Sequence, residues 1–159
     1  MSTPPRTTCA LIVAICIGLL PACSKPDYHT ADGGSGRFAD THGKWLLINY
    51  WAVWCKPCIE EMPELHRFQQ QYADRVQLLT VNYDGAQGQA LQQQITKIGI
   101  KLPVLLDDPA ARLGTSRPDV LPTTLVFDPQ GKLHETLQGE QTLDSLAAAI
   151  GAKPVKNTQ

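Results

Sequence analysis

Hydrophobic and polar positions along the chain follow two alternating periods. Apolar residues run almost without interruption through residues 45–51 and again through 76–83, which is typical of strands buried on both faces. Between these runs, apolar residues recur at three- and four-residue spacing, as an amphipathic helix requires. The members of that helical face are Ile59, Met62, Leu65, Phe68 and Tyr72. This half of the pattern therefore predicts a strand, a helix and a second strand.

The remaining part of the chain continues the alternation. Residues 87–98 have a helical pattern, and a short apolar strand is predicted at 102–106. Residues 123–127 and 132–138 flank a turn and predict a hairpin, after which Thr142 is placed to cap a last helix. Strands that alternate with helices, followed by a hairpin and a helix, predict an α/β fold with a mixed central sheet.

The N-terminus has a different composition. Residues 1–8 contain Arg6 and no acidic residue, and residues 10–20 are apolar, which is the arrangement of a secretory signal. About 11 apolar residues are too few to cross a bilayer core of about 30 Å as a helix. The following Leu20-Pro-Ala-Cys23 resembles a bacterial lipobox, which predicts cleavage before Cys23 and attachment of lipid to its sulfur. An ordinary signal peptide is the alternative.

These patterns divide the chain into four parts. We expect a lipoprotein signal peptide at 1–22, the lipidated Cys23 with a polar tether at 23–40, a single domain at 41–152 and a C-terminal tail at 153–159. The predicted location is the bacterial cell envelope, with the protein lipid-anchored and facing the periplasm or another extracytoplasmic space. A net charge of -1 without a basic block argues against nucleic-acid binding.

Two cysteines remain once the signal is removed and Cys23 is acylated. Of the five in the chain, Cys9 and Cys16 leave with the signal, so Cys55 and Cys58 form the one remaining pair. They stand where the first buried strand gives way to the helix. That is the carboxyl end of a central strand, where such folds place ligands and chemistry.

Redox chemistry is the role that the pair fits best. A purely stabilising disulfide that closes about four residues gains only about 2 kcal/mol in the chain-entropy model. A zinc site would need further ligands at spacings that the sequence lacks, so no metal is expected. A helix start favours an anion, and Lys56 adds a positive charge, so we expect the pKa of the Cys55 thiol below its ordinary value. Cys58, one turn deeper, would resolve a mixed disulfide.

The segment Trp51 to Leu65, WAVWCKPCIEEMPEL, resembles the active-site segment of TlpA/ResA-like thiol-disulfide oxidoreductases of the cytochrome c maturation type, which have a thioredoxin-like fold. Their W-C-x-P-C-x-x-E-x-P pattern is matched at Trp54, Cys55, Pro57, Cys58, Glu61 and Pro63. A second match, Val120-Leu-Pro-Thr-Thr124, resembles the loop that carries a cis-proline facing the cysteines in this fold.

This resemblance implies a mixed sheet with helices on both faces and a redox-active Cys55-Cys58 disulfide. It also implies a cis peptide bond at Leu121-Pro122, and it makes Pro122 and Glu61 catalytic together with the two cysteines. The residues expected to contact a client protein are Trp54, Lys56, Pro57, Leu121 and Thr123. For Trp54, burial in the core is the alternative.

Glu61 is expected to exchange protons with a thiol. Thioredoxin has a buried acid in the strand before its motif, whereas the matching residue here is Asn49, which cannot exchange a proton. Glu61 shares a helix face with Cys58, and a carboxyl group in a partly apolar site has a raised pKa. The alternative is that Glu61 is a solvated acid attracted by the helix dipole.

The predicted function is that of a membrane-tethered, extracytoplasmic enzyme that reduces disulfides in client proteins without an organic cofactor. The partners that the resemblance implies are client proteins with disulfides, apocytochrome c among them, and a membrane thiol-reducing protein as electron donor. The membrane itself would be contacted through lipid on Cys23. Two alternatives stay open. One is an oxidant or isomerase that uses the same residues, and the other is a copper-handling lipoprotein.

Overall fold

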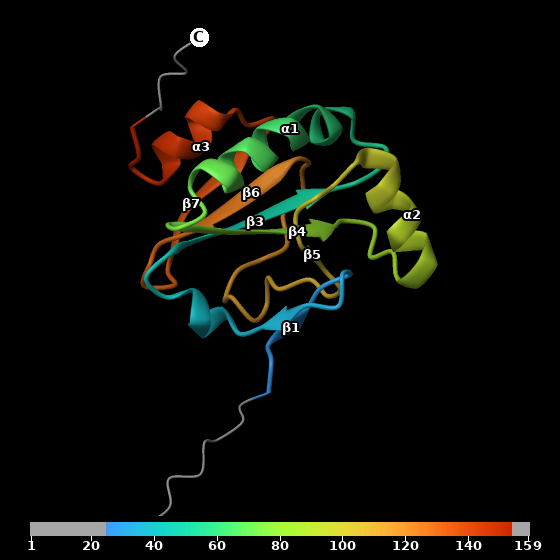
Figure 1. Cartoon of the computed structure of the whole chain (residues 1–159), viewed down its shortest axis with the longest axis horizontal. Helices are drawn as coiled ribbons and strands as arrows, with labels where there is room; N and C mark the ends of the chain where they lie inside the picture. The colour runs from blue at the N-terminus through green and yellow to red at the C-terminus, as the bar shows by residue number, and fades with distance from the viewer. Residues whose placement is uncertain (1–24, 154–159) are drawn as a thin grey trace, which may run out of the picture.

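A five-stranded mixed sheet lies at the centre of the computed structural model, which describes residues 25–153 (Figure 1). Its strands are β3 (Trp45–Trp51), β4 (Val76–Asn82), β5 (Val104–Leu105), β6 (Thr123–Phe127) and β7 (Leu133–Gln138). They stand in the order β5-β4-β3-β6-β7. The β3-β4 and β4-β5 pairs are parallel, whereas the β3-β6 and β6-β7 pairs are antiparallel. The predicted mixed α/β architecture is confirmed.

Three α-helices pack into the core on one face of this sheet. They are α1 (Lys56–Gln71), α2 (Gly88–Ile98) and α3 (Leu143–Ala149). Leu91 of α2 and Leu146 of α3 belong to the same hydrophobic cluster as Leu47 and Trp51 of β3. Figure 1 shows α1 and α3 side by side over the strands, and the two helices are in contact. Because α1 begins directly beyond β3, its first turn lies at the carboxyl end of the central strand.

The opposite face of the sheet is covered without an α-helix among residues 25–153. The covering elements are the hairpin of β1 (Tyr28–His29) and β2 (Ser35–Gly36), the 3-10 helix η1 (Phe38–Thr41) and the irregular segment 106–122. Helices on both faces are predicted, but the segment after β5 forms only turns. Pro109 and Pro118 interrupt it, and proline opposes helix continuation because it lacks an N–H.

The N-terminal hairpin also differs from the predicted tether at 23–40. The Ala31 N–H donates to the Val104 carbonyl, and the Leu106 N–H donates to the His29 carbonyl, so the hairpin extends the β5 edge of the sheet. The rings of Tyr28 and Phe38 pack with centroids 4.9 Å apart. The stretch is polar and rich in glycine, so its sequence has no periodic pattern that would predict pairing with an edge strand. This explains why a tether was predicted in place of a hairpin.

The terminal predictions lie outside the described residues. These are the signal peptide at 1–22, the lipidated Cys23 and nearly all of the tail at 153–159. Within residues 25–153, no helix has the length and apolar character that a membrane span needs.

The helix α1 has the predicted apolar face with one exception. Met62, Leu65 and Phe68 are buried, whereas Ile59 is 37% exposed. In the first turns, the inward positions belong instead to Cys58 and Glu61, which are both fully buried. The first turns of the helix therefore bury a thiol and a carboxyl group, whereas the aliphatic Ile59 is partly exposed.

Two substitutions on α1 test this register. Leu65→Ala should lower the free energy of unfolding by about 2–5 kcal/mol, because it leaves a cavity in the core. Ile59→Ala, on the same helix, should cost less than about 1 kcal/mol, because its side chain is partly solvated. Urea denaturation of the two variants measures both values. Equal losses would place Ile59 in the core and contradict this register.

Candidate active site

Cys55 and Cys58 form a disulfide at the N-terminus of α1, with their Cα atoms 5.3 Å apart. Cys55 is the N-cap residue, and its Sγ accepts the backbone N–H of Cys58 at 3.3 Å. The first N–H groups of a helix lack partners within the helix and mark its positive end. The Cys55 sulfur therefore lies where an anion is favoured, in the position that the sequence predicts.

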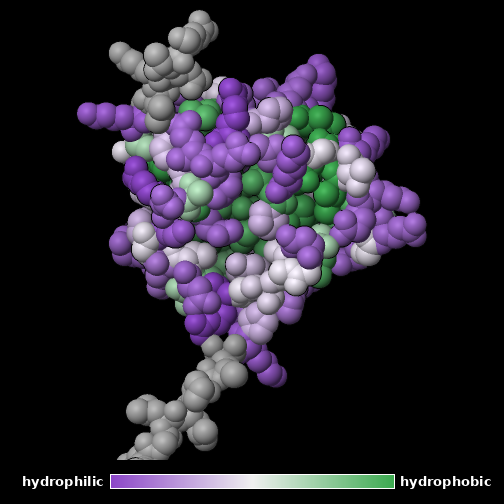
Figure 2. All heavy atoms as spheres, viewed as in Figure 1, coloured by the Kyte–Doolittle hydropathy of each residue, from purple (hydrophilic) through white to green (hydrophobic). Residues whose placement is uncertain are grey.

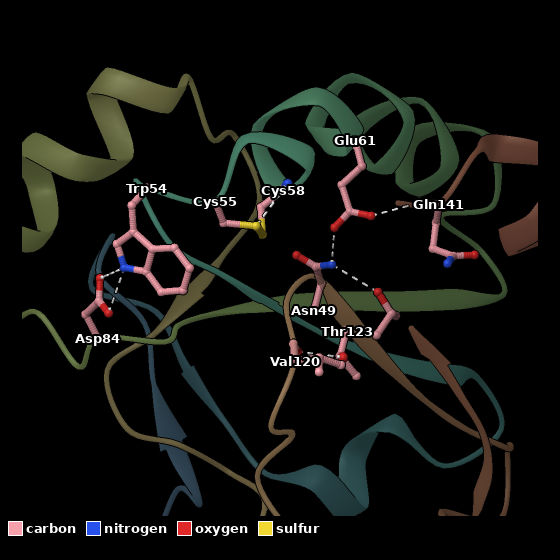
Figure 3. Close-up of a disulfide and its surroundings, with 10 residues drawn as sticks. Asn49, Trp54, Cys55, Cys58, Glu61, Asp84, Val120, Thr123 and Gln141 are labelled. Carbon is pink, nitrogen blue, oxygen red and sulfur yellow. Dashed lines mark hydrogen bonds between the residues drawn. A yellow bond between two sulfur atoms is a disulfide. The ribbon is translucent and has the colours of Figure 1, made fainter. Parts of the chain in front are cut away.

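Both cysteines are covered by neighbouring atoms. Cys55 retains 4% of its surface and Cys58 none, so the predicted order of exposure holds but the difference is small. Trp54, by contrast, is 63% exposed. Its indole Nε1 donates to both carboxylate oxygens of Asp84, at 3.1 and 3.0 Å (Figure 3). Trp54 is thus a surface side chain fixed beside the disulfide, and Asp84, which fixes it, carries no signal in the sequence.

The peptide bond between Leu121 and Pro122 is cis, as the resemblance predicts. Strand β6 pairs with β3, and its first residue, Thr123, lies opposite Tyr50. The loop before β6 therefore lies at the carboxyl end of β3, which is also the end that leads to Cys55. Val120 in the loop is 46% exposed. Two exposed apolar side chains, Trp54 directly before Cys55 and Val120 in the cis-proline loop, therefore lie at the same end of the sheet as the disulfide.

Thr123 does not have the predicted place in client contact. It is fully buried, and its hydroxyl donates to the Val120 carbonyl at 2.9 Å. Its strand is paired on both sides, with Tyr50 and with Gln138. Thr123 therefore shapes the cis-proline loop from inside, because neither its side chain nor its strand edge faces solvent.

A polar network fixes the irregular segment before the cis-proline. The Tyr50 hydroxyl donates to Asp108 at 2.7 Å, and Arg117 lies 3.8 Å from the same carboxylate. The Arg117 guanidinium also stands 3.8 Å from the ring centroid of Tyr83. Burial, together with the Asp108 carboxylate, raises the pKa of Tyr50 well above its usual range, so the hydroxyl stays a neutral donor. The loop is thereby tied to the central strand.

Glu61 is a buried carboxyl group one turn beyond Cys58 (Figure 3). Its Oε1 accepts the Asn49 side-chain N–H at 2.7 Å, and its Oε2 accepts the Gln141 backbone N–H at 2.9 Å. Burial raises the pKa of Glu61 to about 7, although these two hydrogen bonds lower it and the charge of Glu140 raises it further. The solvated alternative is wrong, since none of Glu61 is exposed.

Lys56 and Pro57 lie at the start of α1 beside Cys55. The Lys56 side chain is 84% exposed and pairs with Glu60 at 3.2 Å, so solvent and its partner both weaken its effect on the sulfur. Pro57 occupies the first turn, where a missing N–H costs no hydrogen bond. Their client contacts, like that of Leu121, stay predictions. Among residues 25–153, no group of three or more His, Cys, Asp and Glu side chains is arranged to hold a metal ion.

Known proteins resemble this chain in sequence and in fold. The chain is 32% identical over 116 residues to the thiol-disulfide oxidoreductase ResA of Bacillus thuringiensis, a match that covers 72% of this chain and 66% of that protein. Among solved structures, StoA from Bacillus subtilis matches with a TM-score of 0.64 and 24% identity, covering 77% of this chain and 92% of StoA. The exposed lipoprotein thioredoxin Etrx1 of Streptococcus pneumoniae matches with a TM-score of 0.63 and 28% identity, covering 76% and 93%.

These likenesses define the class as thioredoxin-like, an α/β fold with its cysteine pair directly after the central strand. The chain itself belongs to the AhpC/TSA family, whose profile matches residues 20–136. The predicted resemblance to ResA-like oxidoreductases is confirmed as sequence similarity, over slightly less than two thirds of the length of ResA.

The ionisation of Glu61 should appear in the pH dependence of stability. The ordinary pKa of this carboxyl group is 4.5, and in the folded protein it is about 7. Between these two pH values the folded protein holds a proton that the unfolded chain has released, so the stability contributed by the protonated carboxyl group is lost as pH rises through about 7. Such a difference in pKa corresponds to about 3 kcal/mol. Relative to Glu61→Gln, the wild-type free energy of unfolding should therefore fall by about that amount from pH 4.5 to about 8.

Urea denaturation of the oxidised proteins across this range measures the difference. The amide introduced by Glu61→Gln changes the free energy of unfolding by an amount that does not depend on pH. This amount cancels, because only the pH dependence of the two proteins is compared. Glu60→Gln, on the exposed side of the same helix, is the matched control and should follow the wild-type curve. A flat difference between wild type and Glu61→Gln would mean that Glu61 ionises as an ordinary acid.

Proposed function

We propose that this protein is a membrane-tethered, extracytoplasmic thiol-disulfide oxidoreductase that reduces disulfides in client proteins through Cys55 and Cys58. The observation that carries the proposal is a disulfide at a helix N-terminus with a buried, protonatable carboxyl group one turn away. A purely structural disulfide has no use for such a carboxyl group. Similarity to proteins named thiol-disulfide oxidoreductases supports the same conclusion.

The exchange starts from the reduced pair. The Cys55 thiolate attacks one sulfur of the client disulfide, forms a mixed disulfide and releases the other client sulfur as a thiolate, which takes a proton. Cys58 then transfers its proton to the Glu61 carboxylate and attacks Cys55 Sγ. The second client sulfur leaves and is protonated. Two electrons pass to the client, the pair ends as the disulfide of this structure, and no organic cofactor is needed.

A donor must return two electrons and two protons to the pair before the next cycle. An extracytoplasmic compartment is oxidising, so a membrane thiol-reducing protein is the proposed source. The proposed clients are proteins with accessible disulfides, including apocytochrome c. Their docking surface is formed by the exposed Trp54 and Val120 around the covered sulfurs, with the backbone at Leu121 as the partner of an extended client segment.

The charges around the sulfurs favour the reducing direction. A protein dithiol becomes a strong oxidant when its thiolate is stabilised, as in DsbA. Here Lys56 is solvated and paired with Glu60, so it stabilises a thiolate weakly. The Glu61 carboxyl group, about half ionised near pH 7, opposes a second negative charge beside it.

The proposed tether agrees with the placement of the site. Residues 20–23 resemble a lipobox, and Etrx1, described as an exposed lipoprotein, is a structural relative. The described chain begins on the side of the sheet opposite α1 (Figure 1). A lipid on Cys23 would therefore leave the N-terminus of α1, with its disulfide, turned away from the attachment point.

Trapping of clients tests the proposed exchange. Cys58→Ser should accumulate mixed disulfides through Cys55, because the resolving thiol is missing, whereas Cys55→Ser should trap none. Non-reducing gel electrophoresis of envelope extracts, with and without a reductant, reveals the adducts. If Cys55→Ser traps as well as Cys58→Ser, the assignment of the nucleophile is wrong.

The reduction potential tests the proposed direction. Equilibration with glutathione buffers should give a value below about -180 mV, more negative than that of protein disulfide isomerase. The fraction of oxidised protein is measured by alkylation and mass spectrometry. A value near -120 mV, the range of the oxidant DsbA, would defeat the reducing direction and leave an oxidant or isomerase.

A further inference from the structure

Asn49 lies at the centre of the site, although the exchange steps above give it no part. It is fully buried in β3, and its Nδ2 donates to Glu61 Oε1 at 2.7 Å and to Thr124 Oγ1 at 3.0 Å. Its Oδ1 is buried and has no hydrogen-bond partner among the described residues. Buried acceptors are normally satisfied, so an unpaired one calls for a donor that is present in another state of the site.

The position of this oxygen indicates which donor that is. Cys58 and Glu61 are three residues apart on α1, so their side chains are neighbours on one helix face. Asn49 meets Glu61 from the sheet below that face. In Figure 3, the nitrogen end of the Asn49 amide is turned toward Glu61 and the oxygen end toward the disulfide. In the disulfide Cys58 carries no hydrogen, whereas reduction gives it an S–H in a fully buried place.

We propose that Asn49 is a positioning residue for the reduced protein, whose Nδ2 holds the Glu61 carboxylate and whose Oδ1 accepts the S–H of Cys58. An amide oxygen that accepts from a thiol opposes ionisation of that thiol, since a thiolate would face its lone pairs. Cys55 has the opposite contact, because its sulfur accepts the Cys58 N–H. The two sulfurs are thereby sorted into a nucleophile and a resolving thiol.

The Nδ2 contact, unlike the Oδ1 contact, assists the second step of the exchange, in which Cys58 loses its proton. When Cys58 attacks the mixed disulfide, its S–H bond breaks and the proton passes to the Glu61 carboxylate, which the Asn49 N–H keeps oriented. A bond forms between Cys58 Sγ and Cys55 Sγ, and the client sulfur leaves with the electron pair. Glu140, in the segment before α3, is the further charged group that acts on Glu61. The inference rests on the proposed dithiol exchange but not on its direction.

Two variants of Asn49 separate its two contacts, with the full chain kept reduced by a phosphine. Asn49→Leu removes both contacts. It should raise the Glu61 pKa by about one pH unit or more, because a hydrogen bond to the charged form is lost. In a Cys55→Ser background, it should also move the infrared S–H band of Cys58 to higher frequency. Asn49→Asp keeps an acceptor oxygen and the shape, so it should leave the S–H band at its low frequency. Its own carboxyl group is coupled to that of Glu61, so the Glu61 pKa is compared only between wild type and Asn49→Leu.

Thr80→Val is the matched control, because Thr80 is fully buried on β4 and in register with Asn49. It removes a buried hydroxyl of the same sheet and should change neither readout. Carboxyl carbon NMR, assigned with Glu61→Gln, gives the Glu61 pKa in each protein. An unchanged Glu61 pKa or S–H band in Asn49→Leu, or equal changes in Thr80→Val, would overturn the inference. Neither readout depends on client turnover, so failure here is distinct from failure of the proposed function.

Discussion

A carboxyl group buried between α1 and the sheet is the constraint on which the site depends. Glu61 has no exposed surface, so its oxygens must find donors within the protein. One donor is Asn49 of the central strand, and the other is the backbone of Gln141, which leads into α3. Glu64, one turn further, likewise accepts the Leu143 N–H. The first turns of α1, with the cysteines, are therefore held by the strand and by the start of α3 together.

The surface around the disulfide is built from irregular segments, and polar contacts give each a fixed place. Asp84 orients Trp54, and Asp108 ties the segment before the cis-proline to the hydroxyl of Tyr50. Figure 2 shows apolar residues among hydrophilic ones in the region between α1 and α2. Independently of that region, the exposed Trp54 and the loop of Val120 can be both apolar and well ordered, because the charged side chains of Asp84 and Asp108 hold their segments.

Local patterns in the sequence predicted the strands of the central sheet, the three α-helices and the reactive groups, but not the N-terminal hairpin. Strand β3, the helix after it and the cis-proline loop follow from periodicity and from two motifs, which are properties of short stretches. The contacts that complete the site were not predictable in this way. Glu61 and Gln141 are 80 residues apart, and Trp54 and Asp84 are 30 apart. The inward position of Glu61 was predicted from its spacing to Cys58, but the donors that Asn49 and Gln141 supply to it were not, and neither was the partial exposure of Ile59.

The free energy of a single hydrogen bond limits how far Asn49 can change the reduction potential. A neutral hydrogen bond from a buried thiol contributes about 0.5–1.5 kcal/mol, and because about 1.4 kcal/mol corresponds to 30 mV for a two-electron couple, it favours the reduced form by only about 10–30 mV. The potentials of DsbA and thioredoxin differ by about 150 mV, a difference that thiolate stabilisation supplies. Asn49 therefore cannot reverse the direction that the charges around Cys55 set. Its effect is on the choice between the sulfurs, where a small difference in ionisation is sufficient because only the thiolate attacks.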